Sequence, residues 1–397
     1  MEVDILNIPK LRFKEFTDDW KTHKLKNICY INPKSSNLND KFYYIDLECV
    51  QYGRLKYIQC INKLEAPSRA QRVLLPQDIL FQSVRAYQKN SYFFKKENDI
   101  QTVASTGYAQ LRTKKELSLY IYYYLYFQKF INKVNKLSTG TSYPAINSTD
   151  LGMININIPS FQEQEKIANF LSTVDKKIEN LENTITSLEN QKKGLLQQIF
   201  SQKLRFKDKN GNNYPNWEKK KLGDITTSYS GGTPSVNVKD YYNGTIPFIK
   251  SGEIHNSFTE TFITETGLNS SSAKLVKKGD LLFALYGATS GDTSISKING
   301  AINQAILCVR STTLNLHYLY QLLNFYRNKL LSIYLQGGQG NFSATIFKNL
   351  IFNFPCLEEQ TKIADFLSAF DRKLENQKAQ LEHWQQIKKG LLQQMFV

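Results

Sequence analysis

The sequence lacks the features that mark membrane, secreted and metal-bound proteins. It has no apolar run of the ~18 residues that would span a membrane, and its first residues, MEVDILNIPK, carry acidic side chains where a secretory signal needs basic ones. The five cysteines form no C-x-x-C pair and the four histidines are scattered. Neither a disulfide framework nor a zinc site is therefore expected, and a reducing cytoplasm suits this composition.

Catalytic motifs are missing as well. The chain has no G-x-x-x-x-G-K-[ST] phosphate loop, and the glycine-rich run 337–342 lacks the G-x-G-x-x-G spacing of a dinucleotide site. Asn32-Pro33-Lys34 differs from the N-P-P-aromatic motif of amino-methyltransferases. Asp175 and Asp371, each followed by two basic residues, resemble half of a nuclease site, but we interpret both as solvated helix charges. We expect that this chain catalyses no reaction by itself.

A long internal repeat dominates what is present. Residues 159–200 recur as 355–396 at a constant offset of 196, with 21 identities in 42 positions. Apolar residues follow alternating steps of four and three over about five heptads, which indicates a coiled-coil seam. Lys192 and Lys388 fill polar slots in it. Two such helices in one chain are expected to pair antiparallel.

The ends of the repeated helices carry mixed signals. Ser160 and Glu163 fit an N-terminal capping box, which Cys356 breaks in the second copy. Gly194 and Gly390 follow pairs of lysines, as a C-terminal cap would, yet the apolar phase continues beyond them. Both a helix stop and an uninterrupted helix of about 60 Å fit this pattern.

Positive charge is confined to the segments outside the repeat. The net charge of +16 divides into +9 for residues 1–158 and +8 for 201–354, against −1 and 0 for the two helices. Two separate basic domains favour a shared polyanion, with nucleic acid as the leading candidate, although a merely solubilising surface has the same composition. The lead-in also repeats, because Leu-Arg-Phe-Lys occurs at 11–14 and 204–207.

Each basic domain has mixed secondary structure in the same order. The fold class is therefore predicted as α+β: two mixed domains separated by two long helices that form an antiparallel coiled coil, in a pseudo-twofold internal repeat. The domains are 1–158, 159–200, 201–354 and 355–397. Strands are predicted at 42–50, 53–59, 78–84, 104–112, 246–250, 280–285 and 301–310, and buried helices at 117–137 and 314–335.

Three motifs in the repeat are specific: Glu163-Gln164 with Lys166-Ile167-Ala168, its copy Glu359-Gln360 with Lys362-Ile363-Ala364, and the doubled K-K-G-L-L-Q-Q. With these motifs, the architecture resembles the specificity (S) subunit of type I restriction–modification systems over essentially the whole chain. The second domain also matches in Gly231–Ser235, Gly279–Leu282 and Asn303-Gln304. The first domain departs from this pattern. It has Gln77–Leu80 in place of Gly279–Leu282 and Ser105-Thr106 in place of Asn303-Gln304.

The resemblance implies a non-catalytic subunit of a complex that methylates and restricts double-stranded DNA. Each basic domain would read one half of a split site, and the helices would set the spacing and dock two methyltransferase subunits. S-adenosylmethionine would be bound by those subunits, and ATP and Mg²⁺ by restriction subunits. The chain itself would hold no metal and no cofactor.

Candidate contact residues are polar, basic or aromatic side chains in loops, each of a type that is also common on ordinary surfaces. For DNA they are Lys34, Arg69, Arg72, Gln82, Arg85, Tyr87, Lys89, Thr141 and Tyr143 in the first domain, and Thr233, Ser235, Lys250, Tyr286, Thr289, Gln304, Gln339 and Asn341 in the second. For the coiled coil and subunit docking they are Gln164, Ile167, Leu171, Ile178, Leu195, Gln360, Ile363, Leu367, Leu374 and Leu391.

Two other hypotheses stay open. One is a fragment of a fused restriction–methylation enzyme, which the missing catalytic motifs disfavour. The other is a coiled-coil interaction protein whose basic domains bind RNA or another polyanion without restriction partners. Salt-sensitive binding without a preferred duplex sequence would favour the latter.

Overall fold

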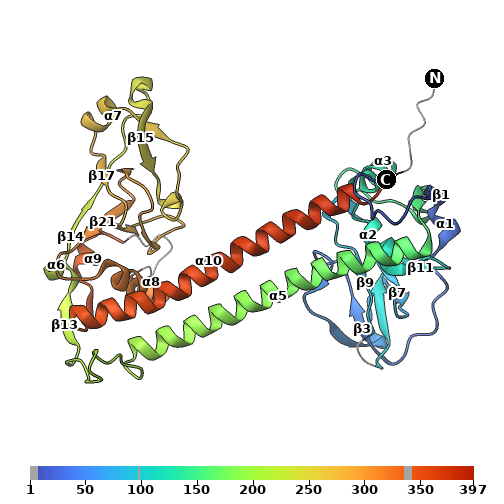
Figure 1. Ribbon diagram of the computed structural model, residues 1–397, viewed down its shortest axis with the longest axis horizontal. Helices are drawn as coiled ribbons and strands as arrows, with labels where there is room; N and C mark the ends of the chain where they lie inside the picture. Colours follow the sequence, from blue (N-terminus) through green and yellow to red (C-terminus); the bar gives the residue numbers. More distant parts are fainter. Residues whose placement is uncertain (1–7, 97–98, 335–341) are drawn as a thin grey trace. The chain divides into compact units, whose positions relative to one another are not determined.

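The computed structural model describes residues 8–96, 99–334 and 342–397, and the chain divides into two compact units. Unit 1 comprises Met1–Glu182 with Ala379–Val397, and unit 2 comprises Asn183–Lys378. Helices α5 (Phe161–Phe200) and α10 (Leu357–Gln394) each contribute one half to either unit (Figure 1). The predicted fold class is confirmed, and both helices continue without interruption through Gly194 and Gly390.

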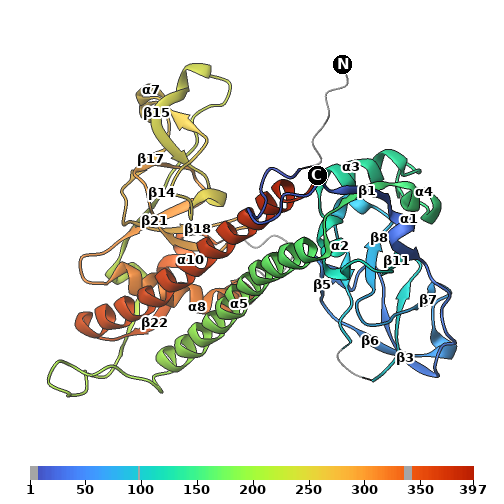
Figure 2. The same ribbon diagram turned by 45° about the vertical axis from the view of Figure 1, so that its right-hand side comes forward.

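Unit 1 contains two four-stranded sheets, with the orders β6-β3-β10-β7 and β2-β11-β8-β9, and the smaller pairs β1-β12 and β4-β5 (Figure 2). Strands β3 and β10 run parallel, while their other neighbours are antiparallel. The elements are β1 (Lys21–Lys24), α1 (Leu25–Ile28), β2 (Cys29–Ile31), β3 (Lys41–Ile45), β4 (Val50–Gln51), β5 (Arg54–Leu55), β6 (Gln59–Asn62), η1 (Lys63–Glu65), β7 (Ala70–Val73), β8 (Ile79–Gln82), η2 (Ala86–Gln88), β9 (Tyr92–Phe93), β10 (Thr102–Ser105), β11 (Tyr108–Thr113), α2 (Ser118–Tyr124), α3 (Gln128–Leu137), α4 (Ser148–Met153) and β12 (Asn155–Ile158).

Unit 2 repeats this plan. Its sheets have the orders β16-β15-β20-β17 and β14-β21-β18-β19, with the pair β13-β22, and β15 runs parallel to β20. The elements are β13 (Glu218–Lys221), α6 (Leu222–Ile225), β14 (Thr227–Ser230), η3 (Lys239–Tyr241), β15 (Tyr242–Ile249), η4 (Ser251–Glu253), β16 (Phe262–Ile263), α7 (Glu265–Asn269), β17 (Lys274–Val276), β18 (Leu281–Ala284), β19 (Thr293–Ile295), β20 (Gly300–Ile302), β21 (Ile306–Arg310), α8 (Leu316–Tyr334), α9 (Ala344–Asn349) and β22 (Ile351–Phe354).

The bounds of several predicted strands differ from those in the structure. Residues 104–112 and 301–310, each expected as one strand, are two strands that belong to different sheets. A turn divides them, and the side chains of Ser105 and Asn303 accept hydrogen bonds from the N–H groups of Gly107 and Ala305, two residues further on. The alternation of side chains continues through such a turn. The sequence pattern therefore does not reveal that one strand ends there and another begins. Residues 46–49 are likewise a turn between β3 and β4, and only Arg54–Leu55 and Gln59 of the strand predicted at 53–59 are extended.

The helix predicted at 117–137 is interrupted in the structure. It divides into α2 and α3, and residues 125–127 separate the two parts. The equivalent α8 of unit 2 runs unbroken to Tyr334, where the described part ends. The apolar period bridges the interruption because Leu125, Phe127 and Phe130 all remain in the core of unit 1.

Each core combines a basic domain with the start of one long helix and the end of the other. In unit 1, Ile167 and Leu171 of α5 and Phe396, just after α10, join the aromatic core under α2 and α3. In unit 2, Ile363 and Leu367 of α10 join Ile199 and Phe200 of α5. The repeat identities follow this burial, because none of the 21 falls in 181–191, outside both cores.

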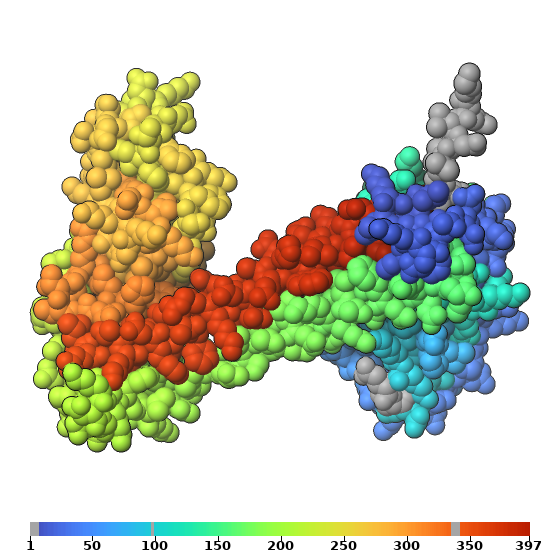
Figure 3. All heavy atoms as spheres, viewed as in Figure 1, coloured from blue at the N-terminus to red at the C-terminus, as the bar shows by residue number. Residues whose placement is uncertain are grey.

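Reciprocal ion pairs fix the antiparallel helix pairing inside each unit. Lys388 Nζ lies 2.6 Å from Asp175 Oδ1 in unit 1, and Lys192 pairs with Asp371 in unit 2. These are the repeat-equivalent residues at the offset of 196. The interpretation of Asp175 and Asp371 as solvated charges is therefore wrong: both are less than one-third exposed and also accept hydrogen bonds from Tyr123 and Gln321. Figure 3 shows α10 packed along the first half of α5 in unit 1.

The repeated Leu-Arg-Phe-Lys lead-in holds the start of each long helix. Arg12 donates two hydrogen bonds of 2.8 Å to the Glu163 carboxylate, and Arg205 does the same to Glu359. Trp217 Nε1 adds a third donor to Glu359 at 3.1 Å. Glu163 is thereby engaged by Arg12, and only the Ser160 half of the predicted capping box is present.

Candidate nucleic-acid interface

Four loops gather at one end of the two sheets of unit 2. Because β15 and β20 are parallel and register Ile249 with Ile302, the residues that follow them, Lys250 and Asn303, emerge at the same edge. Strands β14 and β18 end beside the start of β21. We call residues 231–235, 250–255, 285–292 and 303–305 the loop end of unit 2.

Direct contacts tie these loops together. Thr233 Oγ1 donates a 2.6 Å hydrogen bond to Gln304 Oε1, and His255 Nε2 lies 3.0 Å from Asp292 Oδ2. The loop segment at Gly231 passes so close to β20 that a Cβ added to this glycine would lie 1.8 Å from the carbonyl oxygen of Ile302. Only glycine fits there, which explains why the matched Gly-Gly-Thr-Pro-Ser segment can bring Thr233 beside Gln304.

The sequence candidates of unit 2 are partly assembled by this arrangement. Thr233, Ser235, Lys250 and Gln304 are exposed at the loop end. Tyr286 and Thr289 belong to the same loop end but are half-buried, and Tyr286 packs against the core. Gln339 and Asn341 lie outside the described residues.

Unit 1 has a loop end of the same construction. Strands β3 and β10 are parallel with Ile45 opposite Ala104, and β8 ends beside the start of β11. An isolated bridge between Val84 and Ala145 joins a further loop to this edge. The loop end of unit 1 consists of residues 32–35, 46–49, 83–90, 105–107 and 139–145.

The candidates of unit 1 differ in how free their side chains are. Gln82 is only 3% exposed, and its amide donates to Gln88 Oε1 and accepts from the Asn90 N–H, so it shapes the loop and does not face solvent. Lys89 donates to Gln128, and burial together with the charge of Lys389 lowers the pKa of its ammonium group. Exposed side chains are Lys34, Arg69, Tyr87, Thr141 and Tyr143, and half-buried ones are Arg72 and Arg85.

Away from the loop ends, each unit has one buried aspartate that pairs with a more exposed arginine. Asp280 accepts hydrogen bonds of 2.9 and 2.6 Å from Arg310, and Asp78 accepts bonds of 2.8 and 2.7 Å from Arg112. Both aspartates follow a turn residue with positive φ, Gly279 at +96° and Gln77 at +70°. The aspartate of the matched Gly-Asp-Leu-Leu segment therefore has a structural role: its ion pair joins neighbouring strands.

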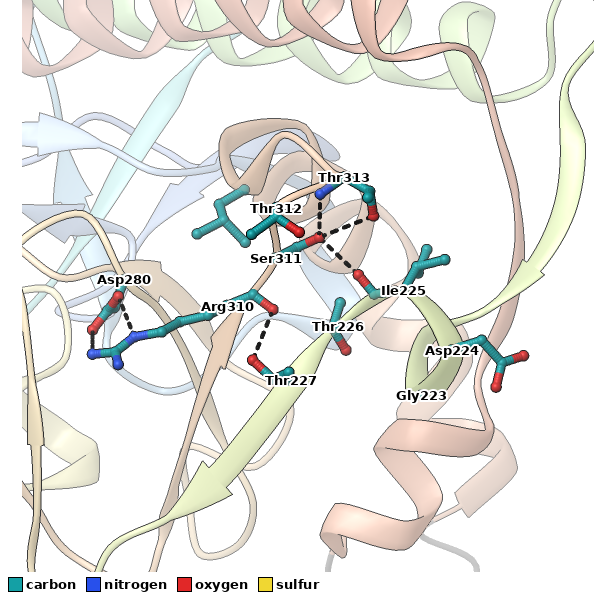
Figure 4. A pocket seen from close by; sticks show the side chains of 11 residues that line it. Gly223, Asp224, Ile225, Thr226, Thr227, Asp280, Arg310, Ser311, Thr312 and Thr313 are labelled. Atoms are coloured by element: carbon teal, nitrogen blue, oxygen red, sulfur yellow. Dashed lines mark hydrogen bonds and ion pairs between the residues drawn. The ribbon is translucent and has the colours of Figure 1, made fainter.

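The Asp280–Arg310 pair borders a cavity of about 740 Å³ in unit 2 (Figure 4). Hydroxyl groups of Thr226, Thr227 and Thr313 line it, and Ser311 donates to the Ile225 carbonyl oxygen. The described residues contain no cluster of three His, Cys, Asp or Glu side chains able to hold a metal ion. In the same part of the chain, no helix is long and apolar enough to cross a membrane.

The predicted coiled-coil residues are of two kinds: apolar residues along the helices, and two glutamines that attach each helix to its own domain. Ile167, Leu171, Ile178, Ile363, Leu367 and Leu374 are buried, while Leu195 and Leu391 are half-buried. Gln164 accepts from the Leu117 N–H and donates to Glu116 and the Pro159 carbonyl. Gln360 repeats this with the Asn315 N–H and the Pro355 carbonyl. Both glutamines thus join a long helix to its own domain, a role that the sequence signalled only through their recurrence.

Comparisons with known proteins found similar sequences. A family model described as the type I restriction modification DNA specificity domain matches residues 17–190 and 214–383. The MjaIX specificity subunit of Methanocaldococcus jannaschii is 30% identical over 211 residues, or 50% of this chain and about half (48%) of that protein. The MjaVIII specificity subunit of that organism is 24% identical over 312 residues, 73% of this chain and 72% of that protein.

A solved structure shares the fold. The S subunit of a type I restriction–modification system from M. genitalium superposes with a TM-score of 0.66 at 17% identity, covering 98% of this chain and 99% of that one. At this identity the likeness concerns the fold alone.

Proposed function

Because the chain belongs to the type I restriction–modification DNA specificity family, we propose that it reads a split, asymmetric DNA site, one half through each loop end. The observation that carries this is the recurrence of one scaffold with different side chains. Where unit 2 has Asn303-Gln304 after β20, unit 1 has Ser105-Thr106 around the end of β10. Two readers with different hydrogen-bonding groups select two different half-sites.

The charge distribution supports DNA as the ligand. All of the excess positive charge lies in the two basic domains, where lysine and arginine side chains supply sequence-independent phosphate contacts. Polar side chains such as Thr233 and Gln304 at the loop end of unit 2 then read base edges.

The two long helices dock two methyltransferase subunits and set the distance between the half-sites. A repeated exposed apolar position supports two equivalent docking surfaces: Phe161 and Leu357, at the offset of 196, are each 49% exposed at the first turn of their helices. Equivalent positions of this kind would give two copies of one partner the same apolar contact.

The catalytic groups reside in the partners. The methyltransferase subunits bind S-adenosylmethionine and methylate adenine, and restriction subunits bind ATP and Mg²⁺. This chain supplies recognition and no catalytic step, and the complex works in the cytoplasm, on double-stranded DNA.

The test is co-expression with the methyltransferase subunit encoded beside it, followed by genome-wide mapping of N6-methyladenine. A split motif that appears only when this chain is present is the expected result. The controls omit this chain or use a methyltransferase subunit that cannot bind S-adenosylmethionine. No new methylation despite a soluble complex would contradict the proposal and favour a polyanion-binding coiled-coil protein. Methylation by the purified chain with S-adenosylmethionine alone would favour a fused enzyme.

A further inference from the structure

Arg85, in the loop end of unit 1, lacks the carboxylate partner that engages many other arginines of this chain. Arg12, Arg54, Arg112, Arg205 and Arg310 each form an ion pair with an acidic side chain. Within the described residues, no carboxylate lies in ion-pair range of Arg85. An unneutralised guanidinium in a loop of a basic domain is available for an anionic or polar ligand.

The backbone holds Arg85 in an unusual conformation. Its φ of +55° lies in the left-handed region, which costs an ordinary L-residue roughly 1–2 kcal/mol. The surroundings enforce it, because the Arg85 N–H donates a 2.7 Å hydrogen bond to the Pro144 carbonyl and Val84 bridges to Ala145. The buried amide of Gln82 fixes the far side of the same loop through Gln88 and Asn90. Such over-determined outliers gather at binding sites.

An exposed tyrosine orients the side chain. The guanidinium carbon of Arg85 lies 4.1 Å from the centre of the Tyr143 ring, and Tyr143 itself is 66% exposed. One Nη2–H donates a long bond of 3.4 Å to the Ser142 carbonyl, and the buried Nε has no partner. Stacking on a ring fixes the plane of a guanidinium without consuming its N–H donors.

We propose that Arg85, stacked on Tyr143, is the guanine-reading side chain of unit 1 and donates two hydrogen bonds to O6 and N7 of one guanine in the major groove. This inference rests on the proposed function, because it presumes that the loop end of unit 1 meets DNA. A planar fork held in one orientation matches the two acceptors on a guanine edge. A phosphate needs no such orientation, and an exposed lysine such as Lys34 serves it equally well.

The test uses the complete complex with its methyltransferase subunits and maps N6-methyladenine for the wild-type chain, Arg85→Gln, Arg85→Lys, Tyr143→Phe and Tyr143→Leu. We expect one half of the wild-type motif to hold a guanine whose preference falls about ten- to a hundred-fold in Arg85→Gln, and less in Arg85→Lys because lysine can also donate to O6 and N7. That position should relax to other bases, while every other position and the second half-site stay unchanged. Tyr143→Phe should keep the preference and Tyr143→Leu should weaken it.

Lys63→Gln is the matched control, because it removes one exposed positive charge from unit 1 in η1, outside the loop end. It should leave the motif intact. An unchanged motif in Arg85→Gln would overturn the inference, and so would an equal loss of methylation at all sites, which is the signature of a phosphate contact. Two half-sites without any G·C pair would overturn it as well.

Two further comparisons distinguish a folding defect from the loss of the guanine contact, and that contact from the proposed function. Thermal unfolding of each purified variant shows whether the chain is folded, and if Arg85→Gln is not, the comparison rests on Arg85→Lys and Tyr143→Leu, because Arg85→Lys keeps the positive charge. A wild-type complex that produces no split motif would refute the proposed function itself. A wild-type motif with Arg85 variants that leave it unchanged would refute the guanine contact alone.

Discussion

At the scale of single residues, buried arginine–carboxylate pairs hold each unit to the long helices. The Glu163 side chain is 1% exposed and that of its partner Arg12 is 11% exposed, and the hydrogen bond to Glu163 raises the pKa of the guanidinium. Glu359 is fully buried against Arg205 at the equivalent place in unit 2. Removing one member of such a pair leaves the other charge buried without a counterion.

Glu163→Gln should therefore lower the free energy of unfolding by about 3 kcal/mol. The matched control is Lys166→Gln, on the same helix. It breaks the ion pair between Lys166 and Glu15, whose side chains are both about half exposed. An exposed pair of this kind contributes less than about 1 kcal/mol. Urea unfolding of the purified variants measures both changes. Equal effects of the two substitutions would show that the Arg12 contact does not stabilise unit 1.

The Asp280–Arg310 pair makes the stability of unit 2 depend on pH. Burial alone would raise the pKa of Asp280, but the hydrogen bonds from Arg310 and the Lys277 N–H outweigh it and lower the pKa below its ordinary value. The folded chain thus binds this proton less readily than the unfolded chain does. The stabilisation is complete above the ordinary carboxyl pKa of about 4 and is lost as the pH falls through the lower folded value.

Asp280→Asn should accordingly lower the melting temperature at pH 7, and the difference from wild type should shrink as the pH falls below about 4. Asp224→Asn, which alters an exposed carboxylate at the same cavity, is the control and should change the melting temperature little at either pH. Thermal unfolding between pH 7 and pH 3 provides the comparison. A difference between wild type and Asp280→Asn that grows toward acid would reverse the assigned direction.

At the scale of elements, the two copies of the long helix share most of their sequence near both ends, where they enter a core, and differ throughout residues 181–191 of the first copy. Gly194 and Gly390 lie inside these helices, and an added Cβ would meet no atom within 4 Å at Gly194 and only Gln394 Nε2, at 3.8 Å, at Gly390. Neither glycine is needed for a turn or a close approach.

Gly194→Ala and Gly390→Ala should each raise the free energy of unfolding by roughly 0.5–1 kcal/mol, because alanine loses less backbone entropy in a helix. Gly267→Ala in α7 is the contrasting variant, since its Cβ would lie 2.5 Å from the Tyr241 carbonyl oxygen. It should destabilise unit 2. Urea unfolding distinguishes these signs, and destabilisation by Gly194→Ala would mean that the helix needs its glycine.

At the scale of the whole molecule, each unit combines segments that are distant in sequence. Val397 accepts a 2.9 Å hydrogen bond from Tyr124, and the Leu11 N–H donates to the Gln394 carbonyl, so the C-terminal turns complete the core of unit 1. In unit 2, the Leu204 N–H donates to the Gln198 carbonyl in the same way. Both loop ends nevertheless lie within the two basic domains, so the proposed function predicts modular specificity.

Replacing residues 201–354 with the equivalent domain of a relative should change one half of the methylated motif and leave the other half as it was. The reason is that every loop of the unit 2 loop end lies inside this segment. Mapping N6-methyladenine with the exchanged chain measures the outcome. Changes in both halves would contradict independent readers.

Lengthening both helices by one heptad, after residues 182 and 378, tests whether they set the spacing. Seven residues add about 10.5 Å of helix while keeping the seam in phase. We expect the unread gap in the motif to grow by about 3 bp at 3.4 Å each. Insertion into one helix alone should abolish methylation, because the pairs Asp175–Lys388 and Asp371–Lys192 lose their register. An unchanged gap with both insertions would assign the spacing to another part of the complex.

The sequence by itself determined the features that repeat or recur at a fixed period. The 196-residue offset, the heptads from Ile167 onward and the +9 and +8 charges of the basic domains required no partner to be recognised. Such patterns survive in one dimension because they reflect local helix geometry and a duplicated plan. They were sufficient for the fold class, whereas the family resemblance also needed the matched motifs, among them the doubled K-K-G-L-L-Q-Q.

Only the tertiary structure decided which side chains remain free to bind. Gln82 and Arg85 look equally available in the sequence, yet one is buried in its own loop and the other stacks on Tyr143 without a carboxylate. Arg310 faces Asp280, and the corner within 104–112 moves Tyr108 to a different sheet from Ser105. These outcomes depend on residues far apart in the chain, which periodicity cannot bring together.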